Sequence, residues 1–153
     1  MYNHKLDNKQ IESHSPQMVV FGTLLLWLGW LMFNAGSSLA MVGEDGSAAF
    51  LSSERAIMNT ILAPSAGGLL TFVIRKYITG ENKDIRMDFQ ALTNGILAGL
   101  VAITASCDSV ESWAAIVIGM IGAVTYSVAC LVMNKLQIDD PLEAFQVHGC
   151  CGV

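Results

Sequence analysis

The chain has 153 residues and a net charge of −5, yet only 14% of its residues are charged and 53% are hydrophobic. A soluble domain carries about 25% charged residues, so this composition argues against a soluble helical core. The sequence also shows no nucleophile motif, metal-ligand spacing or phosphate-binding loop, which disfavours an enzyme, and we expect no nucleic-acid partner, metal or cofactor.

The charged residues fall in clusters that separate long apolar stretches. Four uncharged runs cover residues 13–43, 56–74, 89–107 and 112–134, and a fifth apolar run begins at Ala144. Runs of about 18 or more such residues are typical of transmembrane helices. The sequence therefore predicts an all-α membrane protein with a polar tail at 1–16, four full transmembrane helices and a truncated fifth, at about 17–41, 56–78, 88–107, 112–135 and 141–153.

Basic residues are distributed unevenly between the polar segments. Seven of the eight lie in the N-terminal tail or in the connections after the second and fourth predicted spans: Lys5, Lys9, Arg75, Lys76, Lys83, Arg86 and Lys135. Only Arg55 lies in the other two connections. Loops rich in Lys and Arg stay on the cytoplasmic side of a membrane. The pattern predicts that the N-terminus is cytoplasmic.

The first predicted helix carries an aromatic face with a hydroxyl group. Trp30, Phe33 and Ser37 are spaced i, i+3 and i+7, so on a helix they fall within about 60° of one another. The rings can attract a small cation through their π faces, and the hydroxyl can accept a hydrogen bond. Spacing alone fits an interfacial aromatic belt with a packing serine at least as well.

The middle helices are rich in small residues. Gly95 and Gly99 form a G-x-x-x-G pattern in the third predicted span, and Gly119 and Gly122 lie on the fourth. Small residues let membrane helices approach closely. Pro64 interrupts the second span, which membrane helices tolerate when neighbours satisfy the freed backbone groups.

The last predicted helix carries a histidine into the membrane. Asp140 is a suitable N-cap, Pro141 a suitable first residue, and Glu143 stands where a capping box has its acid. His148 would then lie about 10 Å past the helix start. A neutral imidazole offers one donor and one acceptor, which suits a pore for a small polar molecule or proton relay. The alternative is a structural histidine bonded to a neighbouring helix.

Three segments together resemble the ammonium transporter (Amt/Mep/Rh) family. Residues 22–30 and 33–37 are similar to the sixth membrane helix of that family, residues 94–105 to the eighth, and residues 139–149 to the tenth. The resemblance covers roughly 15–153, which is about the middle third of a full transporter.

The resemblance implies a function and a set of site residues. It implies a homotrimer of eleven-helix subunits built from an inverted repeat, each with its own pore, in which Trp30 and Ser37 recruit ammonium and Phe33 is one of two gate phenylalanines. It also implies that His148 is the second of twin pore histidines and that Thr104 lies near the pore. Ammonium would be captured outside and deprotonated near the gate, and ammonia would pass along the histidines while the proton is carried separately.

We therefore expect a fragment of an ammonium transporter of the plasma membrane that moves ammonium or ammonia across the lipid bilayer. The first gate phenylalanine and the first twin histidine belong to helices outside the resemblance, so we expect that this chain alone does not conduct. The alternative is a short structural membrane subunit, or one half of a split transporter.

Overall fold

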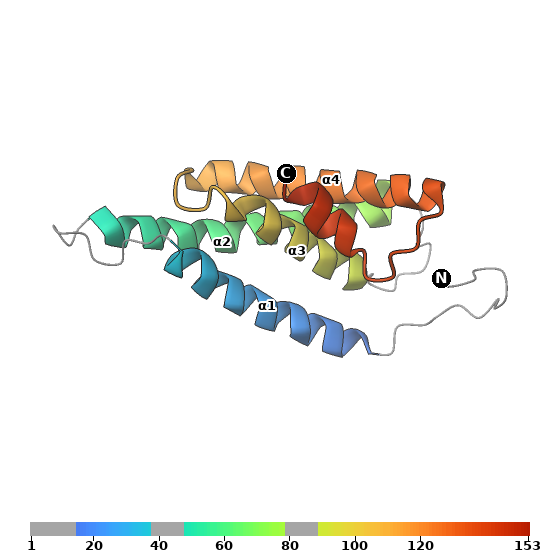
Figure 1. The fold of residues 1–153 in the computed structure, drawn as a ribbon, viewed down its shortest axis with the longest axis horizontal. Coiled ribbons are helices and arrows are strands. Elements are labelled where there is room, and N and C mark those ends of the chain that lie inside the picture. Colours follow the sequence, from blue (N-terminus) through green and yellow to red (C-terminus); the bar gives the residue numbers. More distant parts are fainter. Residues whose placement is uncertain (1–14, 38–47, 79–88) are drawn as a thin grey trace.

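The computed structural model describes residues 15–37, 48–78 and 89–153, and all regular elements within them are helical. Helices α2, α3 and α4 form an up-and-down bundle (Figure 1). The C-terminal end of α1 packs against this bundle, and the N-terminal end of α1 diverges from it. Helix α1, Pro16–Gly36, begins where Ser15 accepts a hydrogen bond from the amide of Met18 and ends at the cap residue Ser37.

Helix α2, Ala48–Val73, continues as the π-helical turn η1, Ile74–Ile78. It begins before the expected Ala56 because Glu54 and Arg55 are exposed on the helix surface and do not interrupt it. The first span was expected to reach residue 41, but α1 ends at Gly36 and the residues from 38 to 41 lie outside the described part. The polar tail lies outside it too, apart from Ser15 and Pro16.

Helix α3, Phe89–Thr104, is shorter than the expected 88–107. The chain turns after Thr104, and Asn59 of α2 stabilises the turn by donating hydrogen bonds to the carbonyls of Cys107 (2.9 Å) and Val110 (2.8 Å). Burial of Cys107 in this turn raises the pKa of its thiol above the usual value, and the negative charge of Asp108 raises it further.

Helix α4, Ser112–Leu136, matches the expected 112–135 and ends at Gln137, which adopts a left-handed conformation (φ 54°). By length and composition, three stretches of the described helices could cross a membrane: Pro16–Gly36, Leu51–Tyr77 and Ser112–Leu136. The third expected span, α3, is apolar but has only 16 residues in the described part. At about 1.5 Å per residue, these extend about 24 Å, less than the ~30 Å hydrocarbon core.

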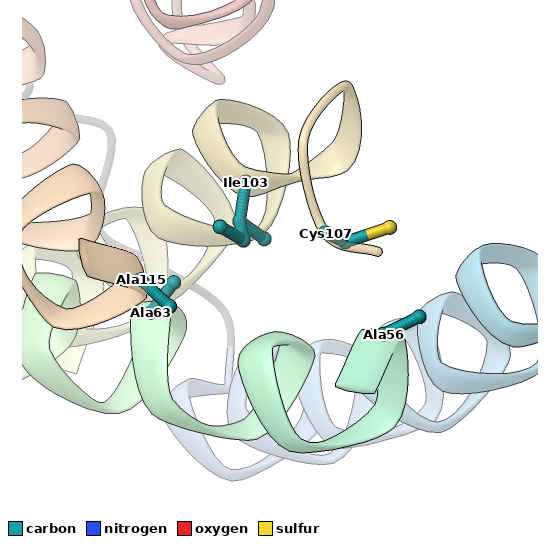
Figure 2. Packing of buried hydrophobic residues seen from close by; sticks show 5 residues of the cluster. All are labelled: Ala56, Ala63, Ile103, Cys107 and Ala115. Atoms are coloured by element: carbon teal, nitrogen blue, oxygen red, sulfur yellow. The ribbon is translucent and has the colours of Figure 1, made fainter. Parts of the chain in front are cut away.

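The helices pack through small residues. Figure 2 shows Ala56 and Ala63 of α2 with Ala115 of α4, beside Ile103 and Cys107. A Cβ on Gly99 would lie 2.8 Å from the Ala63 carbonyl oxygen. These backbones therefore approach as closely as the G-x-x-x-G pattern predicts.

The C-terminal helix begins later than the sequence predicts. Pro141 lies in a turn, Glu143 has a left-handed backbone (φ 54°), and helical structure starts at Ala144 and includes the π-helical turn η2, Phe145–Gly149. Asp140 still caps this helix, but its carboxylate accepts from the amide of Phe145 (2.8 Å). His148 therefore lies only about one turn past the helix start, and the expected 10 Å is wrong.

Candidate functional site

The inner face of α1 points Trp30 towards α3. The Trp30 Nε1–H donates a hydrogen bond to the Thr104 hydroxyl oxygen at 2.7 Å. The Thr104 hydroxyl in turn donates to the carbonyl of Leu100, one turn earlier on α3, also at 2.7 Å. Because the hydroxyl proton is used within α3, the oxygen is oriented to accept from the indole. This chain of two bonds fixes the plane of the Trp30 ring.

The Trp30 ring also contacts the C-terminal helix. Its centroid lies 6.5 Å from that of His148, and the two ring planes differ by only 8°. Three residues from distant parts of the sequence thus meet: Trp30 of α1, Thr104 of α3 and His148 of η2. We call these three residues the Trp30 site. All three are residues for which the sequence predicts a functional role.

The other two predicted residues lie farther along α1. Phe33 is 59% exposed and borders an open groove of about 450 Å³, which is lined by Leu25, Leu26, Gly29, Trp30 and Phe33. The groove is almost entirely apolar, and the Trp30 ring forms part of its wall. Ser37 is exposed and caps the helix, its amide donating to the Phe33 carbonyl at 2.9 Å. Ser37 does not line this groove in the described structure.

This arrangement offers an aromatic wall followed by an imidazole. An indole face attracts a cation, and the attraction grows as the cation loses water in an apolar groove. An imidazole can accept or donate a hydrogen bond to the neutral molecule that remains after a proton is lost.

A second polar cluster, which the sequence did not predict, lies around Glu143. Its carboxylate accepts hydrogen bonds from the Tyr126 hydroxyl and from the Asn94 amide, the latter at 2.7 Å. Arg75 of η1 approaches the other carboxylate oxygen at 3.6 Å. We call these four residues the Glu143 cluster. It ties η1, α3 and α4 to the segment that leads into the His148 helix.

The predicted capping-box role of Glu143 is wrong, because these tertiary contacts hold the side chain away from its own helix start. A signal for the cluster was nevertheless present in the sequence. Asn94 and Tyr126 are hydrogen-bonding side chains in otherwise apolar spans, where an unsatisfied polar group is costly. Such residues need a hydrogen-bonding partner, although the sequence alone does not identify it.

Comparison with known proteins identifies the family to which this chain belongs. Residues 2–153 match the model of the Ammonium Transporter Family. The chain is 38% identical over 149 residues to ammonium transporter 1 member 3 of Solanum lycopersicum, a match that covers 94% of the chain and 31% of that relative. It is also 38% identical over 147 residues to ammonium transporter 1 member 2 of Arabidopsis thaliana, covering 93% of the chain and 28% of the relative.

Solved structures of ammonium transporter family members have a similar fold. The crystal structure of Saccharomyces cerevisiae Mep2 superposes with a TM-score of 0.76 at 36% identity, covering 92% of this chain and 28% of that one. A solved sensor Amt protein gives a TM-score of 0.78 at 33% identity, covering 99% and 34%. The chain belongs to the ammonium transporter family and is an integral membrane protein. It spans about a third of the length of the relatives that it matches.

Proposed function

We propose that the chain forms part of the ammonium path of an ammonium transporter. In this proposal ammonium is captured at the groove beside Phe33 and at the Trp30 ring and gives up a proton there. The ammonia continues past His148, and the proton is carried across separately. The single observation that supports it is the Trp30 site, in which the indole is held by Thr104 and lies parallel to the imidazole of His148.

The physical argument rests on the cost of moving a charge through an apolar passage. An ammonium ion that loses its water needs compensating contacts, and cation–π attraction to an indole contributes about 0.5–2 kcal/mol. Complete desolvation of a charge costs far more than that. Loss of the proton removes this cost, and the neutral ammonia then needs only hydrogen-bonding partners such as the His148 imidazole. Thr104 positions Trp30, because its hydroxyl already has two partners.

The larger assembly is part of the same proposal. His148 acts with a second pore histidine outside the matched region, within an eleven-helix, inverted-repeat subunit of a homotrimer in the plasma membrane. The similarity to plant and yeast family members over most of this chain supports this arrangement. The 153-residue chain alone then gives no ammonium current, because its pore residues line only one part of the path.

The test is ammonium uptake at limiting concentration in transporter-deficient cells. Cells that produce the full-length transporter should lose most uptake with Trp30→Leu. The matched control is Trp113→Leu, because Trp113 is an exposed tryptophan of α4, 68% accessible, whose indole donates to Glu111 instead of to Thr104. Membrane abundance is measured for both variants. Equal uptake by Trp30→Leu and wild type would show that Trp30 does not recruit ammonium and would leave it as an interfacial aromatic.

A further inference from the structure

Pro64 creates a hydrogen-bonding gap in the middle of α2. It lies inside the helix and is almost completely buried. Proline has no backbone N–H, so the carbonyl of Thr60, four residues earlier, loses its helical donor. Water is not available inside a membrane bundle to replace that donor, and an unsatisfied carbonyl there is costly.

A tryptophan from the neighbouring helix fills this gap. The Trp27 Nε1–H of α1 donates to the Thr60 carbonyl oxygen at 2.9 Å. The side chain of the same threonine is contacted by α1 as well, because the Asn34 amide donates to the Thr60 hydroxyl at 2.9 Å. That hydroxyl donates in turn to the carbonyl of Ala56 at 2.6 Å. Thr60 is completely buried, so both of its polar groups depend on these protein partners.

We infer that Trp27 is a positioning residue, whose indole replaces the helical donor that Pro64 removes and thereby fixes α1 against α2. Trp27 and Trp30 are three residues apart on the same inner face of α1, and each donates its indole N–H to a different helix. The bond to Thr60 sets the position and rotation of α1, and the position of α1 decides where the Trp30 ring meets Thr104 and His148. The consequence for transport rests on the proposed function, whereas the structural role of Trp27 does not.

The inference predicts a specific coupling between Trp27 and Pro64. The chain is purified in detergent with Trp27→Phe, which removes the donor, or Trp27→Tyr, which keeps an aromatic ring with a hydroxyl donor. With Pro64 present, the Phe variant should unfold about 2–4 °C below the Tyr variant. The Pro64→Ala background restores a backbone N–H to the Thr60 carbonyl. There the difference should fall below about 1 °C.

Trp30→Phe is the matched control, since it also removes an indole donor from α1. Its partner is Thr104, which Pro64 does not affect. Trp30→Phe should therefore lower the unfolding temperature by the same amount with Pro64 and with Pro64→Ala. An equal Phe–Tyr difference at position 27 with and without Pro64 would overturn the inference and leave Trp27 as a packing residue only.

A second measurement avoids the Pro64→Ala background, which could misfold. Thr60–Ile61 is the only Thr–Ile pair in the sequence, so ¹³C-carbonyl threonine with ¹⁵N isoleucine reports on the Thr60 carbonyl alone by NMR. Trp27→Phe should shift this carbonyl signal in the direction of lost hydrogen bonding, and Trp27→Tyr should shift it less. An unchanged signal in both variants would overturn the inference.

The functional consequence is tested separately. In the full-length transporter, Trp27→Phe should reduce ammonium uptake at limiting concentration and Trp27→Tyr should retain most of it. If the coupling and the carbonyl shift are found while uptake is unchanged in Trp27→Phe, Trp27 stabilises α1 without positioning the transport site. If Trp30→Leu also leaves uptake unchanged, the proposed function itself fails.

Discussion

At the scale of single residues, the hydroxyl of Thr104 is the contact that orients Trp30. Thr104→Val keeps the shape of the side chain but leaves the indole N–H without its acceptor. A lost hydrogen bond of about 1 kcal/mol corresponds to roughly a fivefold weaker capture of ammonium. The measurement is the concentration dependence of ammonium uptake by the full-length transporter.

Thr104→Ser provides the control for this prediction, because serine keeps the acceptor and loses only a methyl group. Uptake by the serine variant should stay close to wild type. If the valine variant also matches wild type, the Trp30–Thr104 bond has no role in capture.

The structure brings together some of the residues that the sequence singles out, but the sequence does not predict their contacts. Helical spacing alone brings Trp30 and Phe33 to one face, and the structure places both on one groove. Periodicity within one helix cannot show that Trp30 meets Thr104 and His148, since such contacts depend on how distant segments pack. The partner of Trp27 was missed for the same reason, although Pro64 signalled that some donor was needed.

At the scale of elements, Gly119 allows α4 to approach α2 closely. A Cβ at this position would overlap the carbonyl of Ala63. Gly119→Ala should therefore force the two backbones apart and lower the thermal unfolding midpoint in detergent by several degrees, because backbone cannot rearrange as cheaply as a side chain.

Gly22→Ala is the control for this change, because a Cβ on Gly22 of α1 has no atom within 4 Å in the described structure. It should leave the midpoint unchanged or raise it slightly, since alanine favours the helix. Equal midpoints for the two variants would contradict the close α2–α4 contact.

The Glu143 cluster makes a prediction about the start of the His148 helix. Glu143→Gln presents an amide group to Tyr126 and Asn94, which both donate to the carboxylate. Hydrogen bonds to a charged group contribute about 2 kcal/mol, so the amide of Val147, which bonds the Glu143 carbonyl, should exchange with solvent faster. Hydrogen exchange followed by mass spectrometry measures this.

Glu111→Gln is a suitable comparison, since Glu111 is an exposed acid whose carboxylate accepts a hydrogen bond from the indole of Trp113. It should leave exchange at Val147 unchanged. Protection at Val147 that is unaltered by Glu143→Gln would show that the cluster does not organise the C-terminal helix.

Helix boundaries that depend on hydropathy agree with those expected from the sequence. Boundaries that depend on tertiary contacts differ from the expected ones. Helix α4 lies where its uncharged run predicts. The predicted helix start at Pro141 failed because Asn94, Tyr126 and Arg75 bind Glu143 and hold the chain in a left-handed turn there. Local capping signals cannot anticipate such competing partners from other helices.

At the scale of the whole molecule, successive helices run in opposite directions (Figure 1). The charged residues near the helix ends therefore fall into two groups, one at each end of the bundle. Arg75, Lys76 and Lys135 lie at the end opposite to Arg55 and Glu111. We propose from this distribution of basic residues that the N-terminus is cytoplasmic. Single cysteines at Gly46 and Lys83, which lie outside the described residues, should react with an impermeant reagent from opposite sides in a Cys-free chain. Reaction of both from one side would contradict this topology.

The proposed ammonium path is tested most directly by ammonium-evoked current through His148 variants of the full-length transporter in proteoliposomes, with trimer size measured by gel filtration. His148→Ala should abolish the wild-type current, or change its proton coupling, while the trimer still forms. His148→Glu should retain some conduction with altered selectivity, because a carboxyl group also exchanges protons. Wild-type current and selectivity in His148→Ala would remove His148 from the path. Loss of the trimer in that variant would identify a structural histidine instead, and either result would contradict the proposed role of His148.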